Sequence, residues 1–337
     1  MIDTLKALCV LNGVSGDEVE VRDYIVDSLR EHADEVAVDV MGNVLVFKKG
    51  AKSPGKKLML CAHMDEVGIV VTQITDDGYL KFAFAGSVDS RVVVGKAVEI
   101  GKQRVFGVIG CKATHLVKAK EREKALETED LYIDIGEKNR EGAQKLVALG
   151  DTGAFCCEIR EFGDGFLKAK AIDDRFGCAV LLELAKSPLP CDCLFVFTVQ
   201  EEVGARGALT AAYRAAPDLA LIIEGTTASD LPSVTENKKI CKAGFGAVIP
   251  FMDGGTIYDR ELREMLAGIA DKHGINWQTK NVVAGSTDGS AVQRSRFGVK
   301  TAAVSAPVRN LHSPSNVCKI SDMEAVAKLV RLFLEEV

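Results

Sequence analysis

Histidine and acidic side chains stand directly after short apolar segments at several places in the sequence. They are His63 after residues 58–62, Asp173 after 166–172, Glu201 and Glu202 after 194–199, Glu224 after 219–223, and His312 in the loop beyond 299–304. Imidazole nitrogens and carboxylate oxygens are ligands that suit zinc, cobalt or manganese. Each residue alone has an ordinary structural explanation, but the joint arrangement predicts a site for divalent metal ions.

Two such ions would supply the chemistry of amide hydrolysis. A pair about 3.5 to 4 Å apart polarises a carbonyl and lowers the pKa of a bridging water, which gives hydroxide near neutral pH. Because Glu201 and Glu202 are adjacent, one can bind metal while the other accepts a proton from that water. Asp65 lies two residues after His63, so on a continuing strand it shares a face with the imidazole and can orient it.

The apolar segments that precede these residues have the length and composition of strands covered on both faces. Helical patterns separate several of them, at residues 177–186, 259–272 and 322–335. In open α/β sheets the carboxyl ends of the strands meet at the ligand crevice, so the segments should deliver their side chains to one edge. The predicted fold is therefore α/β, with a mixed sheet flanked by helices.

Capping patterns mark the helices at the two ends of this fold. Ser15 and Glu18 form a capping box for a predicted helix over residues 16–31. Ser321 and Glu324 form a second capping box, which predicts the start of the last helix.

The stretch from residue 67 to residue 166 has a different pattern, with many short β-like pieces separated by glycine and charged residues. Closely spaced short strands of this kind indicate a small β-barrel or sandwich. A chain of 337 residues also exceeds the length at which a single core usually stops growing. We therefore expect residues 1–66 and 167–337 to form a catalytic domain and residues 67–166 to form an inserted β-barrel domain.

The composition of the chain indicates which classes of binding partner and which cellular compartment to expect. A formal net charge of −6 argues against a nucleic-acid partner, and the mixed signs of residues 118–124 indicate a solvated surface segment. No signal-like leader opens the sequence and no apolar run approaches the length of a membrane span, so we expect neither secretion nor a membrane partner. The ten cysteines lack zinc-ribbon spacing, which indicates free thiols in a reducing cytoplasm.

Five short strings occur in an order that resembles the M42 family of metallo-aminopeptidases, the glutamyl or deblocking aminopeptidases, over essentially the whole chain. They are AHMDEVG at 62–68, AIDDRFG at 171–177, EEVG at 201–204, EGT at 224–226 and LHSP at 311–314. The resemblance implies a dinuclear peptidase domain interrupted by a smaller β-domain that supports assembly into a twelve-subunit hollow tetrahedron. It also implies two divalent ions per subunit and peptide substrates with a free N-terminus.

The resemblance further implies a role for each predicted site residue. His63 and Glu224 would complete one metal site, Glu202 and His312 would complete the other, and Asp173 would bridge the two. Glu201 would take a proton from the metal-bound water and pass it to the leaving amine, while Asp65 orients His63.

Two departures from the family pattern concern substrate and metal preference. Glu224 stands where many relatives have Asp, and residues 285–289 (GSTDG) resemble a G-G-T-D-A loop near the substrate pocket with two positions changed. The preferred N-terminal residue and the native metal, zinc, cobalt or manganese, therefore stay open at this point.

The same ligand chemistry serves other amide hydrolases. An N-acyl amino acid deacylase or a carboxypeptidase of the same clan would use the same five ligands, so the difference lies in whether the site recognises a free amine. A non-catalytic peptide-binding protein is the alternative outside enzymes, although neither Glu201 nor any predicted ligand is lost.

Overall fold

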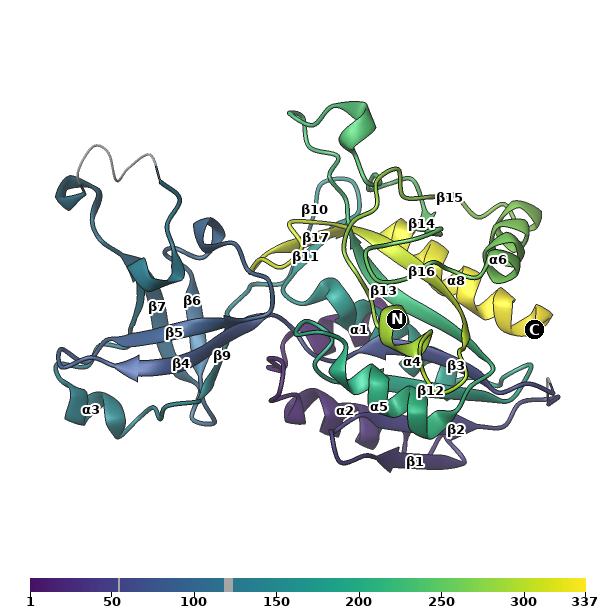
Figure 1. Cartoon of the computed structure of the whole chain (residues 1–337), viewed down its shortest axis with the longest axis horizontal. Coiled ribbons are helices and arrows are strands. Elements are labelled where there is room, and N and C mark those ends of the chain that lie inside the picture. Colours follow the sequence, from purple (N-terminus) through teal and green to yellow (C-terminus); the bar gives the residue numbers. More distant parts are fainter. Residues whose placement is uncertain (54, 118–123) are drawn as a thin grey trace.

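The computed structural model describes residues 1–53, 55–117 and 124–337. It places a large mixed sheet, covered by helices, beside a closed β-barrel (Figure 1). This arrangement confirms the predicted α/β fold with a small barrel. Except for its last residue, the predicted surface segment at 118–124 lies outside the described residues.

The large sheet has eleven strands, of which nine form one continuous order. In that order they are β1 (Glu35–Val38), β2 (Val44–Lys48), β12 (Cys193–Thr198), β3 (Leu58–His63), β13 (Leu219–Thr227), β16 (Lys300–Arg309), β17 (Asn316–Lys319), β11 (Phe166–Ala169) and β10 (Arg160–Phe162). Strands β14 (Ala247–Val248) and β15 (Trp277–Gln278) pair at the side of β16. The central strands β12, β3, β13 and β16 are parallel neighbours, whereas the outer pairs are antiparallel.

Helices cover both faces of this sheet. One face packs against α1 (Ile2–Cys9), α2 (Val19–Leu29), α4 (Ile172–Lys186), α6 (Arg260–Lys272) and α8 (Ile320–Glu336). The opposite face packs against α5 (Arg206–Ala215) and the short α7 (Gly289–Val292). The coverage on both sides explains why the central strands contain continuous apolar runs.

Strand β3 illustrates how the sequence specifies a central strand. Its alternate residues Leu58, Leu60 and Ala62 join the core beneath the first helical layer. Met59 and Cys61, between them, join the core on the other face. Because successive side chains of a strand point to opposite faces, a continuous apolar run is the pattern of a strand that is buried on both faces.

Both predicted capping boxes are wrong. The second helix begins at Val19 rather than at residue 16, and no side chain caps it. The Ser15 hydroxyl is used elsewhere, because it donates a hydrogen bond of 2.6 Å to the carboxylate of Asp65. The last helix begins at Ile320, so Ser321 already lies inside its first turn.

The barrel closes in the order β4 (Gly68–Ile74), β5 (Leu80–Ala85), β8 (Leu131–Asp134), β7 (Val105–Cys111), β6 (Ala97–Ile100) and β9 (Thr152–Phe155). Its connections carry α3 (Arg140–Gln144) and the 3₁₀ helices η1 (Ser90–Val92), η2 (Thr114–Leu116) and η3 (Thr128–Asp130), while η4 (Glu236–Lys238) follows β13. The barrel encloses its own apolar core. Strand β10 falls inside the range 67–166 but pairs with β11 in the large sheet, and the division into domains stays a prediction.

The barrel is attached to the N-terminal segment of the chain. Asn12 donates to Glu99 at 3.1 Å and Thr152 donates to Asp17 at 2.7 Å. Val14 packs against Ala85 and Ala154 in a small apolar cluster of its own. These contacts therefore fix the position of the barrel beside the segment that joins α1 to α2.

All ten cysteines are free, as the sequence indicated, and seven of them are buried. In the described parts of the chain, the helices lack the combination of length and apolar composition that crossing a membrane requires.

A buried ion network ties the start of the barrel to the helical layer. Glu66 accepts a hydrogen bond of 2.8 Å from Lys170 and lies 3.3 Å from Nη2 of the fully buried Arg175. The same carboxylate accepts the main-chain N–H of Gly13 at 3.1 Å. Arg175 also donates to the carbonyl of Met64 at 2.8 Å, directly after β3.

Removing the shared carboxylate with Glu66→Ala should lower the free energy of unfolding by about 3 to 5 kcal/mol, because Lys170 and Arg175 would remain buried without a counter-charge. Urea denaturation measures this change. The matched control is Glu264→Ala, which removes an exposed partner of Arg260 and should leave the midpoint unchanged. Equal midpoints for both variants would show that the buried network contributes nothing to stability.

Candidate metal centre and substrate cleft

All the predicted metal ligands, and the predicted base, lie at one edge of the large sheet. They are His63 at the end of β3, Asp173 in the first turn of α4, Glu201 and Glu202 after β12, Glu224 within β13, and His312 after β16. The expected strand over residues 166–172 is shorter than predicted, because β11 ends at Ala169. The edge is the carboxyl end of the parallel strands, where ligands bind in α/β sheets.

The ligand-type atoms form two pairs on either side of Asp173. On one side, Nε2 of His63 lies 3.1 Å from Oε1 of Glu224. On the other side, Nε2 of His312 lies 3.1 Å from Oε2 of Glu202. Asp173 places Oδ1 at 3.5 Å from Nε2 of His63 and Oδ2 at 3.9 Å from Nε2 of His312. A single carboxylate thus faces both pairs, as a carboxylate shared between two ions must.

Unpaired buried atoms indicate that this cluster fits metal ions. Nε2 of His63 and Oε2 of Glu224 are buried and have no hydrogen-bond partner among the described residues. Buried polar atoms are normally paired, so these two atoms require an explanation. Two groups of residues each bring their ligand atoms within 4.8 Å of one another. One group is His63, Asp173 and Glu202, and the other is His63, Asp174 and Glu224. Nitrogen and oxygen donors of this kind suit zinc, cobalt and manganese.

The orientation of His63 leaves one ring nitrogen available as a ligand. Its Nδ1 lies 3.0 Å from the main-chain carbonyl of Asp65, which can only accept a hydrogen bond. Nδ1 must therefore carry the proton, and Nε2 presents its lone pair to the site in the neutral ring.

Asp65 makes a contact that the sequence did not predict. Its carboxylate oxygen Oδ1 lies 3.4 Å from Nδ1 of His63, farther than its own carbonyl. The carboxylate instead accepts the main-chain N–H groups of Glu201 at 2.9 Å and Glu202 at 3.2 Å, besides the hydroxyl of Ser15. Asp65 therefore fixes the loop that carries two of the site carboxylates as well as the imidazole.

Glu18 supports the same loop from the start of α2. Its side chain, buried in the structure, accepts the N–H of Gln200 at 3.1 Å and the N–H of Gly16 at 2.7 Å. Gln200 has a φ of 57°, a left-handed conformation that is strained for a residue other than glycine. From the sequence, Glu18 was predicted only as part of a capping box, because its partner Gln200 lies far away along the chain.

Burial and mutual repulsion raise the pKa of the carboxyl groups around His63. Burial, with the neighbouring charge of Asp173, raises the pKa of Glu202 and Glu224 well above the ordinary range. Burial also raises the pKa of Glu201 to about 8, against the opposing effect of His63. For Asp173 burial acts in the same direction, but its contacts with His63 outweigh burial and lower the pKa. Burial therefore disfavours the ionised form of these three glutamates, and a bound cation would offset this cost.

Asp174 is a second residue that the sequence analysis did not assign to the site. Its Oδ1 accepts the N–H of Gly177 at 2.9 Å. Its Oδ2 is buried without a hydrogen-bond partner among the described residues, and it belongs to one of the two candidate metal groups.

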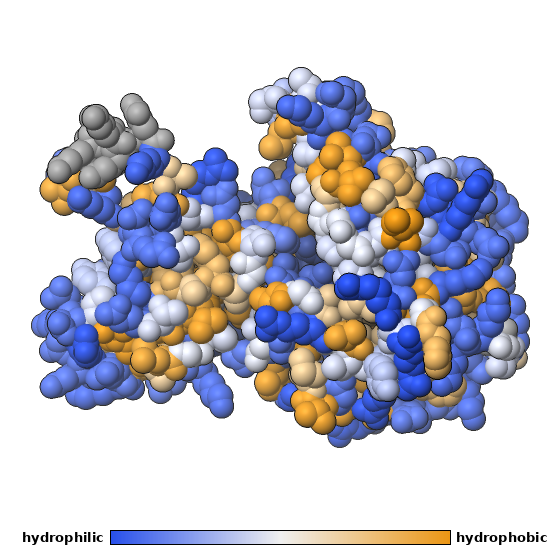
Figure 2. Space-filling model, in the orientation of Figure 1, coloured by the Kyte–Doolittle hydropathy of each residue, from blue (hydrophilic) through white to orange (hydrophobic). Residues whose placement is uncertain are grey.

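A cavity of about 610 Å³ opens from these residues along the sheet edge. Besides the site carboxylates it is lined by residues 225–229 after Glu224, by residues 284–287, and by Lys280. A neighbouring cavity of about 640 Å³ shares His312 and continues to residues 87–96 beside the barrel. Figure 2 shows a hollow in the molecular outline between the barrel and the larger part of the molecule. These two neighbouring cavities form the cleft beside the candidate metal centre.

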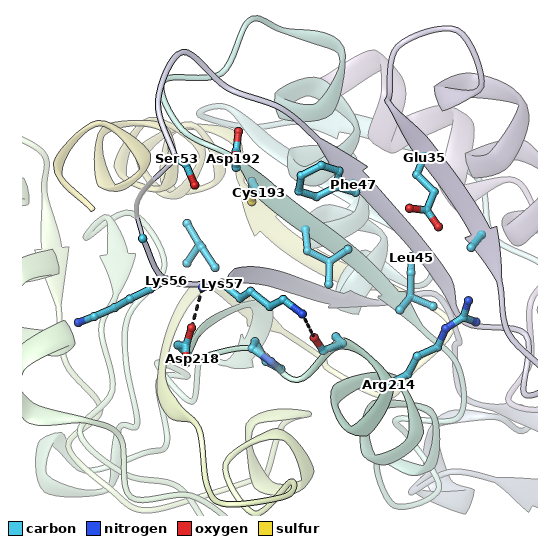
Figure 3. A pocket seen from close by; sticks show the side chains of 16 residues that line it. Glu35, Leu45, Phe47, Ser53, Lys56, Lys57, Asp192, Cys193, Arg214 and Asp218 are labelled. Atoms are coloured by element: carbon cyan, nitrogen blue, oxygen red, sulfur yellow. Dashed lines mark hydrogen bonds between the residues drawn. The ribbon is translucent and has the colours of Figure 1, made fainter.

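A third cavity, of about 600 Å³, lies at the opposite ends of the strands and contains none of the predicted site residues. Figure 3 shows Leu45 and Phe47 beside Lys57. The N–H of Lys57 donates to Asp218 at 2.8 Å and its Nζ donates to the carbonyl of Ala215 at 3.4 Å. The predicted site residues therefore lie away from this cavity, at the other edge of the sheet.

Known proteins resemble the chain over its whole length. A lysyl aminopeptidase of Pyrococcus furiosus is 30% identical, and the match covers 99% of this chain and 96% of the relative. The solved structure of an aminopeptidase from Desulfurococcus kamchatkensis is 35% identical, with a TM-score of 0.94 over 100% of this chain and 94% of that one. The TET1 peptidase of Pyrococcus horikoshii, described as assembling into a tetrahedron or a large octahedral shell, is 34% identical with a TM-score of 0.88 over 100% and 99%.

The family model of the M42 glutamyl aminopeptidases matches residues 42–329, a range that contains every predicted site residue. This match confirms the resemblance found in the short sequence strings. The chain therefore belongs to the M42 glutamyl aminopeptidase family and is a peptide hydrolase.

Proposed function

We propose that the protein removes the first residue from peptides with a free N-terminus, in a reaction that depends on two divalent metal ions. His63 and Glu224 would hold one ion, Glu202 and His312 the other, and Asp173 would contact both. The observation that carries this proposal is the position of Asp173, whose two carboxylate oxygens face the two histidines at 3.5 and 3.9 Å. When bound, such ions polarise the scissile carbonyl and increase the acidity of water at neutral pH.

Glu201 is the proposed general base. Its Oε2 lies 4.0 Å from Nε2 of His63, beside the two ligand pairs but outside both. From this place Glu201 would accept a proton from the attacking water and deliver it to the nitrogen of the leaving peptide. Asp65 would act through the protein, because it holds the N–H groups of Glu201 and Glu202 and the ring of His63.

The barrel is the proposed inserted domain, and we propose that it supports assembly into a homo-oligomer. Phe106, Val108 and Leu116 are apolar residues of the barrel region that remain 38 to 62% exposed in the single chain. Phe106 and Val108 are two residues apart in β7, so they share one face of the strand, and contiguous exposed apolar surface marks protein contacts. A light-scattering mass equal to one chain of 36.2 kDa would contradict the assembly. The free thiols agree with a cytoplasmic location, which cell fractionation would test.

The experiment that tests the function compares one short peptide with its N-acetylated twin. The enzyme is stripped with a chelator and refilled with zinc, cobalt or manganese before each assay. We expect release of the first residue from the free peptide only, and only after refilling. Loss of the acetyl group from the blocked peptide alone would instead assign a deacylase, and cleavage at the carboxyl end would assign a carboxypeptidase.

A further inference from the structure

Asn316 is a buried side chain that lies beside the candidate metal centre without being one of the proposed ligands. It is the first residue of β17, pairs with Ala169 of the neighbouring strand β11, and is only 3% exposed (Figure 1). A small cavity is lined by Asn316 together with Asp173, Glu202 and His312. Asn316 therefore reaches the ligand set from behind.

The amide of Asn316 binds three main-chain groups. Its Oδ1 accepts the N–H of Ile172 at 3.1 Å, directly before the carboxylate proposed to contact both ions. Its Nδ2 donates to the carbonyls of Asn310 at 3.0 Å and Ser313 at 3.1 Å, on either side of His312. Because a carbonyl only accepts and an N–H only donates, these contacts fix the orientation of the amide. One side chain thus connects the start of α4 to the loop that carries His312.

The loop that carries His312 needs such a support. Asn310 and His312 have φ values of 56° and 54°, in the left-handed region that is uncommon for residues other than glycine. The polar contacts of the His312 ring with described residues all involve Nε2, which faces Glu202 and Asp173. The ring of His63, by contrast, is fixed through Nδ1, which lies 3.0 Å from a main-chain carbonyl. The direction of the His312 ring therefore depends on its main chain.

We propose that Asn316 is a positioning residue that holds His312 against Asp173 and so sets the affinity for the ion beside His312. This inference rests on the proposed dinuclear function. The hydroxyl of Ser313 also donates to the carbonyl of Asn310, at 2.7 Å, but that bond lies within the loop and does not connect it to α4. Residues that orient metal ligands commonly change metal affinity by about 10- to 100-fold.

The test is a cobalt titration of chelator-stripped, full-length enzyme, followed by the visible absorption of the bound ions. His312→Ala removes a nitrogen ligand and so identifies the binding step of the ion beside His312. Asn316→Ala should weaken this same step by about 10- to 100-fold and weaken the other step less. Saturating cobalt should restore kcat in Asn316→Ala, because all the proposed ligands remain.

A second variant, Asn316→Asp, separates the two donated hydrogen bonds from the packing of the side chain. The carboxylate has the shape of the amide and still accepts the N–H of Ile172, but it places an oxygen against the carbonyls of Asn310 and Ser313. We expect the step beside His312 to weaken in this variant too. The added negative charge alone would strengthen cobalt binding, so this result is specific to the lost donors.

The matched control is Asn139→Ala, which should leave both cobalt steps unchanged. Asn139 also binds a main-chain group, the N–H of Gly142 at 2.9 Å, but it is exposed in the barrel and lines neither cavity of the cleft.

Three results would overturn the role of Asn316 and leave the proposed function standing. They are wild-type affinity in Asn316→Ala, an equal loss in both of its steps, and a strengthened step in Asn316→Asp. A wild-type enzyme that binds cobalt in a single step, with one ion per chain, would contradict the proposed dinuclear function itself.

Discussion

Replacing Glu201 by glutamine is expected to lower kcat by about 10³-fold while the protein keeps its full metal content. The amide has the size of the carboxylate but cannot accept a proton at neutral pH. The ligand pairs His63 with Glu224 and His312 with Glu202 do not include Glu201, so both should stay intact. Steady-state kinetics measures kcat, and elemental analysis of the purified variant measures bound metal.

The neighbouring residue provides the control for this prediction. Glu202→Gln changes the same functional group one position along the loop, but it alters a proposed ligand that faces His312 at 3.1 Å. Metal content should therefore fall in Glu202→Gln and not in Glu201→Gln. If Glu201→Gln turned over substrate at the wild-type rate, another group would have to be the base.

Replacing His63 by alanine should remove metal and activity together. Its Nε2 lies near oxygens of Glu224, Asp173 and Glu201, so the substitution removes the nitrogen ligand proposed for the ion at that place. We expect the metal content to fall to one ion or fewer per chain, and kcat to fall by about 10³-fold or more. Elemental analysis measures the loss of metal, and steady-state kinetics measures the loss of kcat.

His273→Ala is the matched control for the loss of an imidazole. His273 is exposed at the end of α6 and is not among the residues that line the two cavities of the site, so it should be dispensable for metal and turnover. Full metal content in His63→Ala would mean that the ion pair is held by other residues.

The fold could be predicted from the sequence because local residue patterns specify the central strands and the helices. The alternation of Leu58, Leu60 and Ala62 with Met59 and Cys61 follows directly from a strand that has helices on both sides. Glycine and charged residues between short β-like segments likewise predicted the barrel. The strand ends then placed most of the site residues at one edge.

Contacts between distant segments could not be predicted from the sequence. Ser15 and Glu18 have the spacing of a capping box, but in the fold their side chains form hydrogen bonds with the carboxylate of Asp65 and the N–H of Gln200. A capping box is a local preference worth about 1 kcal/mol, and tertiary hydrogen bonds to a buried carboxylate can exceed it. The lining of the cavity of about 610 Å³ could not be predicted either, because it is formed by segments from several parts of the chain.

The measurement that tests the central claim most directly is anomalous diffraction from crystals of the enzyme loaded with zinc, cobalt or manganese. The account predicts two peaks, one contacting His63 and Glu224 and the other contacting Glu202 and His312, with Asp173 in contact with both. A single peak, or two peaks that do not share Asp173, would contradict the dinuclear site on which the proposed function rests.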